Sequence, residues 1–181
     1  KDISIYSICD NVMPHENFIF QKSFVKKFLE KLDGIIIMSD STENELISLN
    51  KSYNYKKLFL PIITNLGKIL DYKRTRLDLD LDENKTIFLF FGLIREYKGL
   101  DILLKSINKI NQDLSAKFEL LIVGENYEHL SKYQNILNDN FISNVKWITK
   151  YVPDELISSY FSCCDYVVLP YKTASQSGII P

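Results

Sequence analysis

Residues 86–107 read TIFLFFGLIREYKGLDILLKSI, and this stretch decides the fold. The apolar run Ile87–Phe91 predicts a strand that is buried on both faces. The strand is followed by a loop that runs from Gly92 to Gly99. Apolar residues at helical spacing come next and predict a helix, namely Leu100, Leu103, Leu104, Ile107 and Ile110. A buried strand, a glycine loop and an amphipathic helix together indicate an α/β unit with a parallel sheet.

The same alternation continues towards the C-terminus. Further strands are predicted at Leu120–Val123, Val145–Ile148 and Tyr166–Leu169. The intervening helices are predicted from the apolar stripes Leu130, Tyr133 and Leu137, and Ile157, Tyr160, Phe161 and Cys164. Four buried strands with helices between them predict an α/β, Rossmann-like parallel sheet with helices on both faces.

A partial second α/β unit is predicted at the N-terminal side. Strands are expected at Ile3–Ile8 and Ile35–Met38, and an extended stretch at Leu58–Ile63. One helix should bury a side formed by Phe24, Val25, Phe28, Leu29 and Leu32. A capping box of Thr42 and Glu45 should open the next helix. We therefore divide the chain into a first unit at 1–66, a charged linker at 67–85 and a second unit at 86–181.

Composition excludes several classes of protein. A hydrophobic content of 46% with 11 Phe and 11 Tyr excludes intrinsic disorder. A formal net charge of -1 argues against nucleic acid as the main partner. The odd count of 3 Cys, two of them adjacent, favours reduced thiols and a cytoplasmic location. Because the chain opens on Lys1 and stops at Pro181, we expect it to be a piece of a longer protein.

The loop from Gly92 to Gly99 is the first candidate binding site. It follows a buried strand, and ligands of open parallel sheets bind at the carboxyl ends of strands. Arg95 and Lys98 place two positive charges there, beside the start of a helix, which suits a diphosphate. A surface turn with solvated cations is the alternative. The loop matches neither a Walker loop nor the dinucleotide-binding fingerprint.

Two further loops are expected at the same edge of the sheet. Gly124 follows the next strand and would let the backbone approach a ligand. The polar residues Ser175, Gln176, Ser177 and Gly178 follow the last strand and suit phosphate or sugar hydroxyls. A plain turn remains the alternative for both loops.

A metal site is not predicted. The alternating acids of Asp78–Asp82 lie in the charged stretch before a strand, so we interpret them as solvated. Neither His15 nor His129 has a zinc-ligand spacing, and no nucleophile–base set can be assigned to them.

Several phrases, in order along the chain, resemble the retaining GT-B glycosyltransferases of the "group 1" family. The most specific is FFGLIREYKGLD at Phe90–Asp101. The others are NVMPHE at Asn11–Glu16, LIVG at Leu121–Gly124, YVPDE at Tyr151–Glu155, CDYVVLPY at Cys164–Tyr171 and SQSG at Ser175–Gly178. The resemblance implies two Rossmann-like domains, of which this chain would hold the end of the acceptor domain and most of the donor domain.

The resemblance also implies roles for individual residues. Arg95 and Lys98 would hold the donor diphosphate, assisted by the helix start near Gly99. The donor-binding set would be Gly92, Gly99, Gly124, Tyr151, Ser175, Gln176, Ser177 and Gly178, and the loop after Ile148 would lie near the base. Asn11 and His15 would lie on the acceptor side. No metal or cofactor is implied, since the nucleotide sugar is a substrate.

The expected activity is transfer of a hexose from a UDP- or GDP-sugar to a glycan or lipid-linked acceptor, with retention of configuration, in cell-surface polysaccharide biosynthesis. The present chain alone is expected to be inactive, and peripheral membrane contact of the full-length protein is left open. The sequence departs from the family pattern at Asp10, Leu93 and Ser175, where a histidine, an arginine and a glutamate are common. A sugar-nucleotide epimerase of the same architecture and a non-catalytic nucleotide-binding module therefore stay as alternatives.

Overall fold

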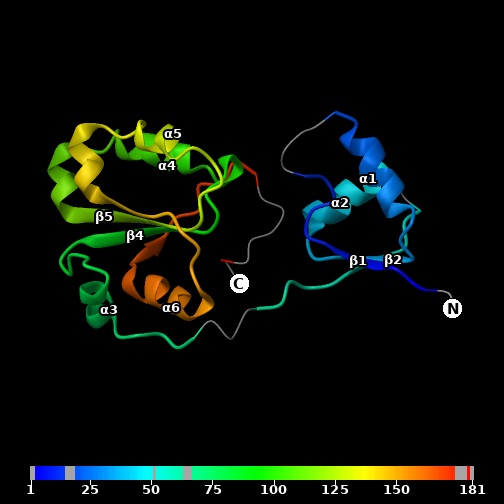
Figure 1. Ribbon diagram of the computed structural model, residues 1–181, viewed down its shortest axis with the longest axis horizontal. Helices are drawn as coiled ribbons and strands as arrows, with labels where there is room; N and C mark the ends of the chain where they lie inside the picture. Colours follow the sequence, from blue (N-terminus) through cyan, green and yellow to red (C-terminus); the bar gives the residue numbers. More distant parts are fainter. Residues whose placement is uncertain (1–2, 15–18, 51, 63–66, 174–178, 180–181) are drawn as a thin grey trace. The chain divides into compact units, whose positions relative to one another are not determined.

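The computed structural model of the protein describes residues 3–14, 19–50, 52–62, 67–173 and 179. The chain divides into two compact units, Lys1–Ile63 with Thr173–Pro181, and Thr64–Lys172. Each unit contains a parallel sheet accompanied by helices (Figure 1). The predicted α/β fold class is confirmed.

The second unit is built on a four-stranded sheet in the order β6-β5-β4-β7, with all neighbours parallel. Its strands are β4 (Thr86–Phe91), β5 (Phe118–Val123), β6 (Val145–Ile148) and β7 (Tyr166–Val167). Its α-helices are α3 (Tyr72–Asp78), α4 (Leu100–Ile107), α5 (Ser131–Gln134) and α6 (Asp154–Cys163). The 3-10 helices are η1 (Glu96–Lys98), η2 (Gln112–Lys117) and η3 (Asp139–Asn144). The predicted strands are present, although β7 ends two residues early.

Both faces of β4 and β5 are covered, which explains their continuous apolar sequences. Successive side chains of a strand point to opposite faces. Phe90 and Ile122 therefore pack in one core with α4, whereas Leu89 and Leu121 pack in a second core with Tyr160 of α6. Figure 1 shows α4 and α5 on one side of β4 and β5, and α3 and α6 on the other.

The first unit has a three-stranded sheet in the order β1-β2-β3, built from β1 (Tyr6–Cys9), β2 (Gly34–Ile37) and β3 (Tyr55–Lys57). Its helices are α1 (Gln21–Leu29) and α2 (Asp40–Leu49). The third strand precedes the predicted stretch, and the described residues 58–62 lie outside any strand. Buried Ile35 and Ile37 of β2 and Leu46 of α2 belong to the core of this unit.

Two predictions about the helices of the first unit were wrong. In α1, Phe24 and Phe28 are 73% and 53% exposed, and the buried face runs through Gln21, half-buried Val25 and Leu29. Both stripes have the same i, i+4 spacing, so periodicity alone did not separate them. In α2, the N-cap is Ser39, whose hydroxyl accepts from the Thr42 N–H at 3.1 Å.

The description of residues 67–85 as a charged linker also needs correction, because this stretch contains α3, which packs against α6. Arg76 of α3 is fully buried despite its charge. Its guanidinium donates to the Cys163 carbonyl at 2.9 Å and to the Asp165 carboxylate at 2.7 Å. These contacts fix the stretch to the turn that precedes β7.

Candidate functional site

The loops after β4 and β5 pack directly against each other at the carboxyl edge of the second unit's sheet. The Gly92 N–H donates to the Val123 carbonyl at 2.9 Å, and Ile94 forms a parallel bridge with Asn126. Gly124 has φ +143°, and a Cβ built there would overlap the carbonyl oxygen of Gly92. The structure thus brings together two of the glycines predicted for donor binding, and at Gly124 the close approach requires glycine.

The loop after β7 closes over the start of α4. Gly99, the N-cap of α4, has φ +72°, and a Cβ there would overlap the carbonyl oxygen of Pro170. Gly99 and Leu100 are both buried. Glycine at position 99 therefore allows the loop after β7 to pack against the N-cap of α4, and the role of this helix start in holding a diphosphate stays a prediction.

Lys98 lies in η1 and turns towards the loop after β7. Its ammonium donates a hydrogen bond to the Tyr171 hydroxyl at 2.8 Å and lies 4.3 Å from the centroid of the Tyr171 ring. The Lys172 N–H donates to the Tyr97 carbonyl at 2.9 Å, which ties the loop to η1. The side chain of Lys98 is half-buried, so its charge remains within reach of a ligand.

Arg95 turns towards the other neighbouring loop. Its guanidinium carbon lies 4.8 Å from the centroid of the Tyr127 ring, beyond β5. The Tyr127 hydroxyl donates to the Glu125 carboxylate at 3.1 Å, and this bond raises the pKa of Tyr127. Arg95 and Lys98 therefore share the loop after β4 but rest on aromatic rings from opposite flanking loops.

Ion pairs of Asp101 connect α4 to the loop after β7. Asp101 of α4 pairs with Lys172 at 2.9 Å and with Lys105 at 3.3 Å. Burial acts to raise the pKa of Asp101, but the hydrogen bonds from these two lysines outweigh it and hold the pKa below its ordinary value. Asp101 is therefore ionised at neutral pH, and it anchors the segment that contains Tyr171.

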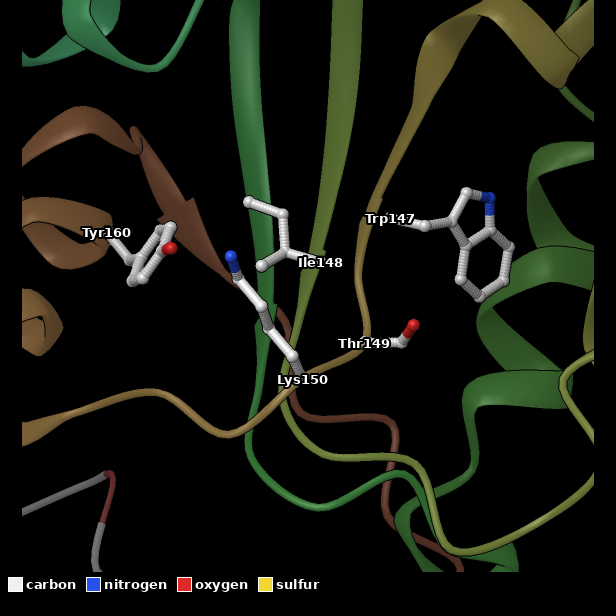
Figure 2. A pocket seen from close by; sticks show the side chains of 5 residues that line it. All are labelled: Trp147, Ile148, Thr149, Lys150 and Tyr160. Atoms are coloured by element: carbon white, nitrogen blue, oxygen red, sulfur yellow. The ribbon is translucent and has the colours of Figure 1, made fainter.

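A hollow of about 390 Å³ lies beside the carboxyl end of β6. It is lined by Trp147, Ile148, Thr149, Lys150 and Tyr160. Figure 2 shows Ile148, Lys150 and Tyr160 on one side of the strand, with Trp147 and Thr149 turned to the other. Burial raises the pKa of Tyr160, so its hydroxyl is protonated at neutral pH and can donate a hydrogen bond. An apolar wall with a few polar groups suits a planar heterocycle.

The other predicted site residues are placed less informatively. Tyr151 follows β6 and is largely exposed. Ser175, Gln176, Ser177, Gly178 and His15 lie outside the described residues. Asn11 is half-buried just after β1 in the first unit, where the neighbouring Asp10 carbonyl accepts from the Thr42 hydroxyl at 2.9 Å.

The acids of Asp78–Asp82 have protein partners. Asp78 pairs with Arg74 at 3.1 Å, and Asp80 pairs with Lys146 at 3.2 Å. Among the described residues, no group of three or more His, Cys, Asp and Glu could hold a metal ion. Cys163 is buried, which raises its pKa to about 12, so the thiol is protonated at neutral pH and is a poor nucleophile.

Sequence reasoning missed the two tyrosines that contact the cations. Tyr127 and Tyr171 each lie in a loop after a strand of the parallel sheet, at the edge where ligands of such sheets bind. An aromatic residue in that position was the available signal. Within the described part of the chain, no helix is both long and apolar enough to cross a bilayer.

Comparison with known proteins supports this description. Residues 71–179 match the family described as glycosyl transferases group 1. A GDP-mannose:glycolipid 4-beta-D-mannosyltransferase of Xanthomonas campestris pv. campestris is 24% identical over 173 residues, which cover 94% of this chain and 44% of that protein. The chain therefore spans less than half of that relative's length.

Two solved structures share the fold. WaaG, a glycosyltransferase involved in lipopolysaccharide biosynthesis, matches with a TM-score of 0.78 and 13% identity, covering 97% of this chain and 52% of its own. HepE of Anabaena, solved in complex with UDP and glucose, matches with a TM-score of 0.77 and 15% identity, covering 98% of this chain and 49% of its own.

Proposed function

The chain belongs to the group 1 glycosyl transferases, and from this premise we propose that the full-length protein moves a hexose from a UDP- or GDP-sugar to a glycan or lipid-linked acceptor. We place the reaction in cell-surface polysaccharide biosynthesis and expect the anomeric configuration to be retained. The observation that carries the proposal is the loop after β4, which presents Arg95 and Lys98 at the carboxyl edge of the sheet.

The chemistry that this edge can supply is stabilisation of a leaving group. When the sugar–phosphate bond breaks, negative charge grows on the nucleoside diphosphate. Cations held in place before the reaction stabilise that charge without the cost of reorganising. Lys98, and Arg95 on the other side of the loop, can provide such charges, so the proposal needs no metal ion.

We propose that the hollow beside β6 binds the nucleoside. It lies at the same edge of the sheet as the two cations, two strands away from β4. Ile148 and Tyr160 offer apolar surface to a base, and Lys150 and the Tyr160 hydroxyl offer hydrogen bonds. The relatives do not distinguish UDP from GDP, because one is named for GDP-mannose and another was solved with UDP.

We place the protein in the cytoplasm, where nucleotide sugars would meet it. All three cysteines, Cys9, Cys163 and Cys164, carry free thiols, as expected for a reducing compartment.

The test is the affinity for UDP and GDP after removal of both cations. Loss of two charge-assisted contacts from half-buried groups should weaken binding by about 3 kcal/mol in Arg95→Ala/Lys98→Ala. Lys109→Ala/Lys117→Ala removes the same charge from exposed positions outside the site and should bind like the original protein. Unchanged affinity in the first pair would remove the diphosphate role.

A product assay on the full-length protein separates transfer from the two alternatives. We expect a glycosylated acceptor with the anomeric configuration of the donor. An epimerised nucleotide sugar, or binding without turnover, would contradict the proposal. Residues 1–181 alone should bind nucleotide weakly and transfer no sugar, which the same assay can check.

A further inference from the structure

The Tyr171 hydroxyl is the group that orients Lys98, and we propose that Tyr171 is a positioning residue for the cation that holds the donor diphosphate. The inference rests on the proposed function, since it assigns a partner to the same site. Its basis is the 2.8 Å hydrogen bond from the Lys98 ammonium to the Tyr171 hydroxyl, together with the ring lying 4.3 Å from that ammonium.

Tyr171 can orient another side chain because its own backbone is held on both sides. On one side, the Pro170 carbonyl packs against Gly99, where a side chain would not fit. On the other side, Lys172 donates its backbone N–H to the Tyr97 carbonyl at 2.9 Å and pairs through its ammonium with Asp101 at 2.9 Å. The aromatic ring between these anchors therefore starts from a fixed backbone.

Lys98 needs such a partner because a lysine side chain is flexible. Its four-carbon stem has many rotamers, and ordering them on ligand binding costs affinity. The ammonium carries three donors. A hydrogen bond to Tyr171 uses one of them and restricts the rotamers, while two donors remain for phosphate oxygens.

The chemical nature of the partner matters as much as its position. Tyr171 offers a neutral hydroxyl and the electron-rich face of a ring, so it orients Lys98 without cancelling its charge. The neighbouring Lys172 is paired with the carboxylate of Asp101, which compensates its charge. The two lysine contacts thus have different consequences. The Lys172–Asp101 pair anchors the loop, whereas the hydrogen bond from Lys98 to Tyr171 leaves the charge of Lys98 available for a ligand.

The experiment compares nucleoside diphosphates with monophosphates. Affinities for UDP, UMP, GDP and GMP are measured by calorimetric titration, and the ratio of diphosphate to monophosphate affinity isolates the contacts made to the second phosphate. Tyr171→Phe removes the hydroxyl and keeps the ring. Tyr166→Phe makes the same change on exposed β7, where the ring stacks on Phe88 instead, and serves as the matched control.

We expect Tyr171→Phe to lower the diphosphate-to-monophosphate ratio roughly tenfold, the effect of losing one hydrogen bond to a charged group. Monophosphate affinity and the melting temperature should stay unchanged, and Tyr166→Phe should behave like the original protein. An unchanged ratio in Tyr171→Phe, or an equal loss for monophosphate and diphosphate, overturns the positioning role, because general structural damage would weaken both ligands alike.

Lys98→Met separates this inference from the function on which it rests. If the ratio collapses in Lys98→Met but not in Tyr171→Phe, the diphosphate site stands and the role of Tyr171 is overturned. If Lys98→Met keeps the original ratio, the inference fails, and the Arg95→Ala/Lys98→Ala pair then decides whether the diphosphate role stands. Support requires a collapsed ratio in Lys98→Met and no further loss when Tyr171→Phe is added to it.

Discussion

Two arginines of the second unit show how differently the same side chain is used at the two ends of the sheet. Arg76 is fully buried near the turn that precedes β7. Its guanidinium donates to the carbonyls of Cys163 and Lys85 and to the carboxylate of Asp165. Arg95 lies at the carboxyl edge, half-buried and stacked on Tyr127. We infer that Arg76 holds the fold together, whereas Arg95 and nearby Lys98 serve the ligand.

The contrast has a simple physical origin. A buried charge is tolerated when its hydrogen-bonding capacity is used within the protein. Arg76 meets that condition, and the Tyr72 ring covers it at 4.0 Å. A cation meant for a ligand must keep donors available and stay partly hydrated until the ligand arrives. Lys98 is in that state, because its half-buried ammonium uses one of three donors on the Tyr171 hydroxyl.

The largest effect is expected from removing Arg76. Arg76→Met should lower the free energy of unfolding by about 3–5 kcal/mol, because it leaves buried carbonyls and the Asp165 carboxylate without their partner. Chemical denaturation measures the change. A loss close to zero would mean that Arg76 and Arg95 do not differ in the way described.

The second-largest effect on stability is expected at Gly99, where the loop after β7 packs against the N-cap of α4. Gly99→Ala should cost about 1–3 kcal/mol or more of unfolding free energy, since φ is positive and the new Cβ meets the Pro170 carbonyl. Gly67→Ala is the matched control, because Gly67 also has positive φ, at +95°, but faces the side chain of Ser158. Equal losses of unfolding free energy in the two variants would show that backbone strain alone, and not the contact with the Pro170 carbonyl, is responsible.

Strand β4 and helix α3 show which features the sequence could predict and which it could not. Strand β4 was predicted within a residue because a strand buried on both faces reads as a continuous apolar run. Helix α3 was missed because its sequence, YKRTRLD, is mostly polar. The sequence alone does not distinguish Arg74 from Arg76. Arg76 belongs to the core because its partners Cys163 and Asp165 lie almost ninety residues away in the sequence.

The sequence predicts where a candidate site lies, and the roles of its residues stay predictions. The glycine loops and their cations follow from the rule that ligands bind at the carboxyl ends of parallel strands. The rule does not say which way a cation turns, nor that the Pro170 carbonyl packs against Gly99. Such details depend on the packing of neighbouring loops, which local sequence patterns do not encode.

The stability that the Arg76–Asp165 cluster provides should depend on pH. Burial acts to raise the pKa of Asp165, but hydrogen bonds from the Ile87 N–H, Tyr72 and Arg76 hold it below the ordinary 3.8. Its contribution to stability is therefore complete above about pH 5 and is lost as the pH falls through 3.8 towards the lowered pKa. Denaturation between neutral and acid pH should show this loss.

Two variants check the source of that acid sensitivity. Asp165→Asn should be less stable at neutral pH and lose less stability on acidification than the original protein. Asp139→Asn, which changes an exposed carboxylate of η3, should follow the original protein. An identical pH profile in Asp165→Asn would argue against this cluster as the source.

The smallest effect is expected for Arg74, the exposed arginine that lies in α3 with Arg76. Arg74→Met breaks an exposed i, i+4 pair with Asp78 and should change the free energy of unfolding by no more than about 0.5 kcal/mol. It is the direct counterpart of Arg76→Met, with the same substitution two residues away. A loss of similar size in both variants would contradict the role given to burial.

The most direct test of the account is a crystal structure of the protein with UDP or GDP bound. We predict that an oxygen of the terminal phosphate lies about 3 Å from the Lys98 ammonium, with the Tyr171 hydroxyl still bonded to it and the base in the hollow beside β6. A nucleotide whose diphosphate lies away from the loop between Gly92 and Gly99 would contradict the account.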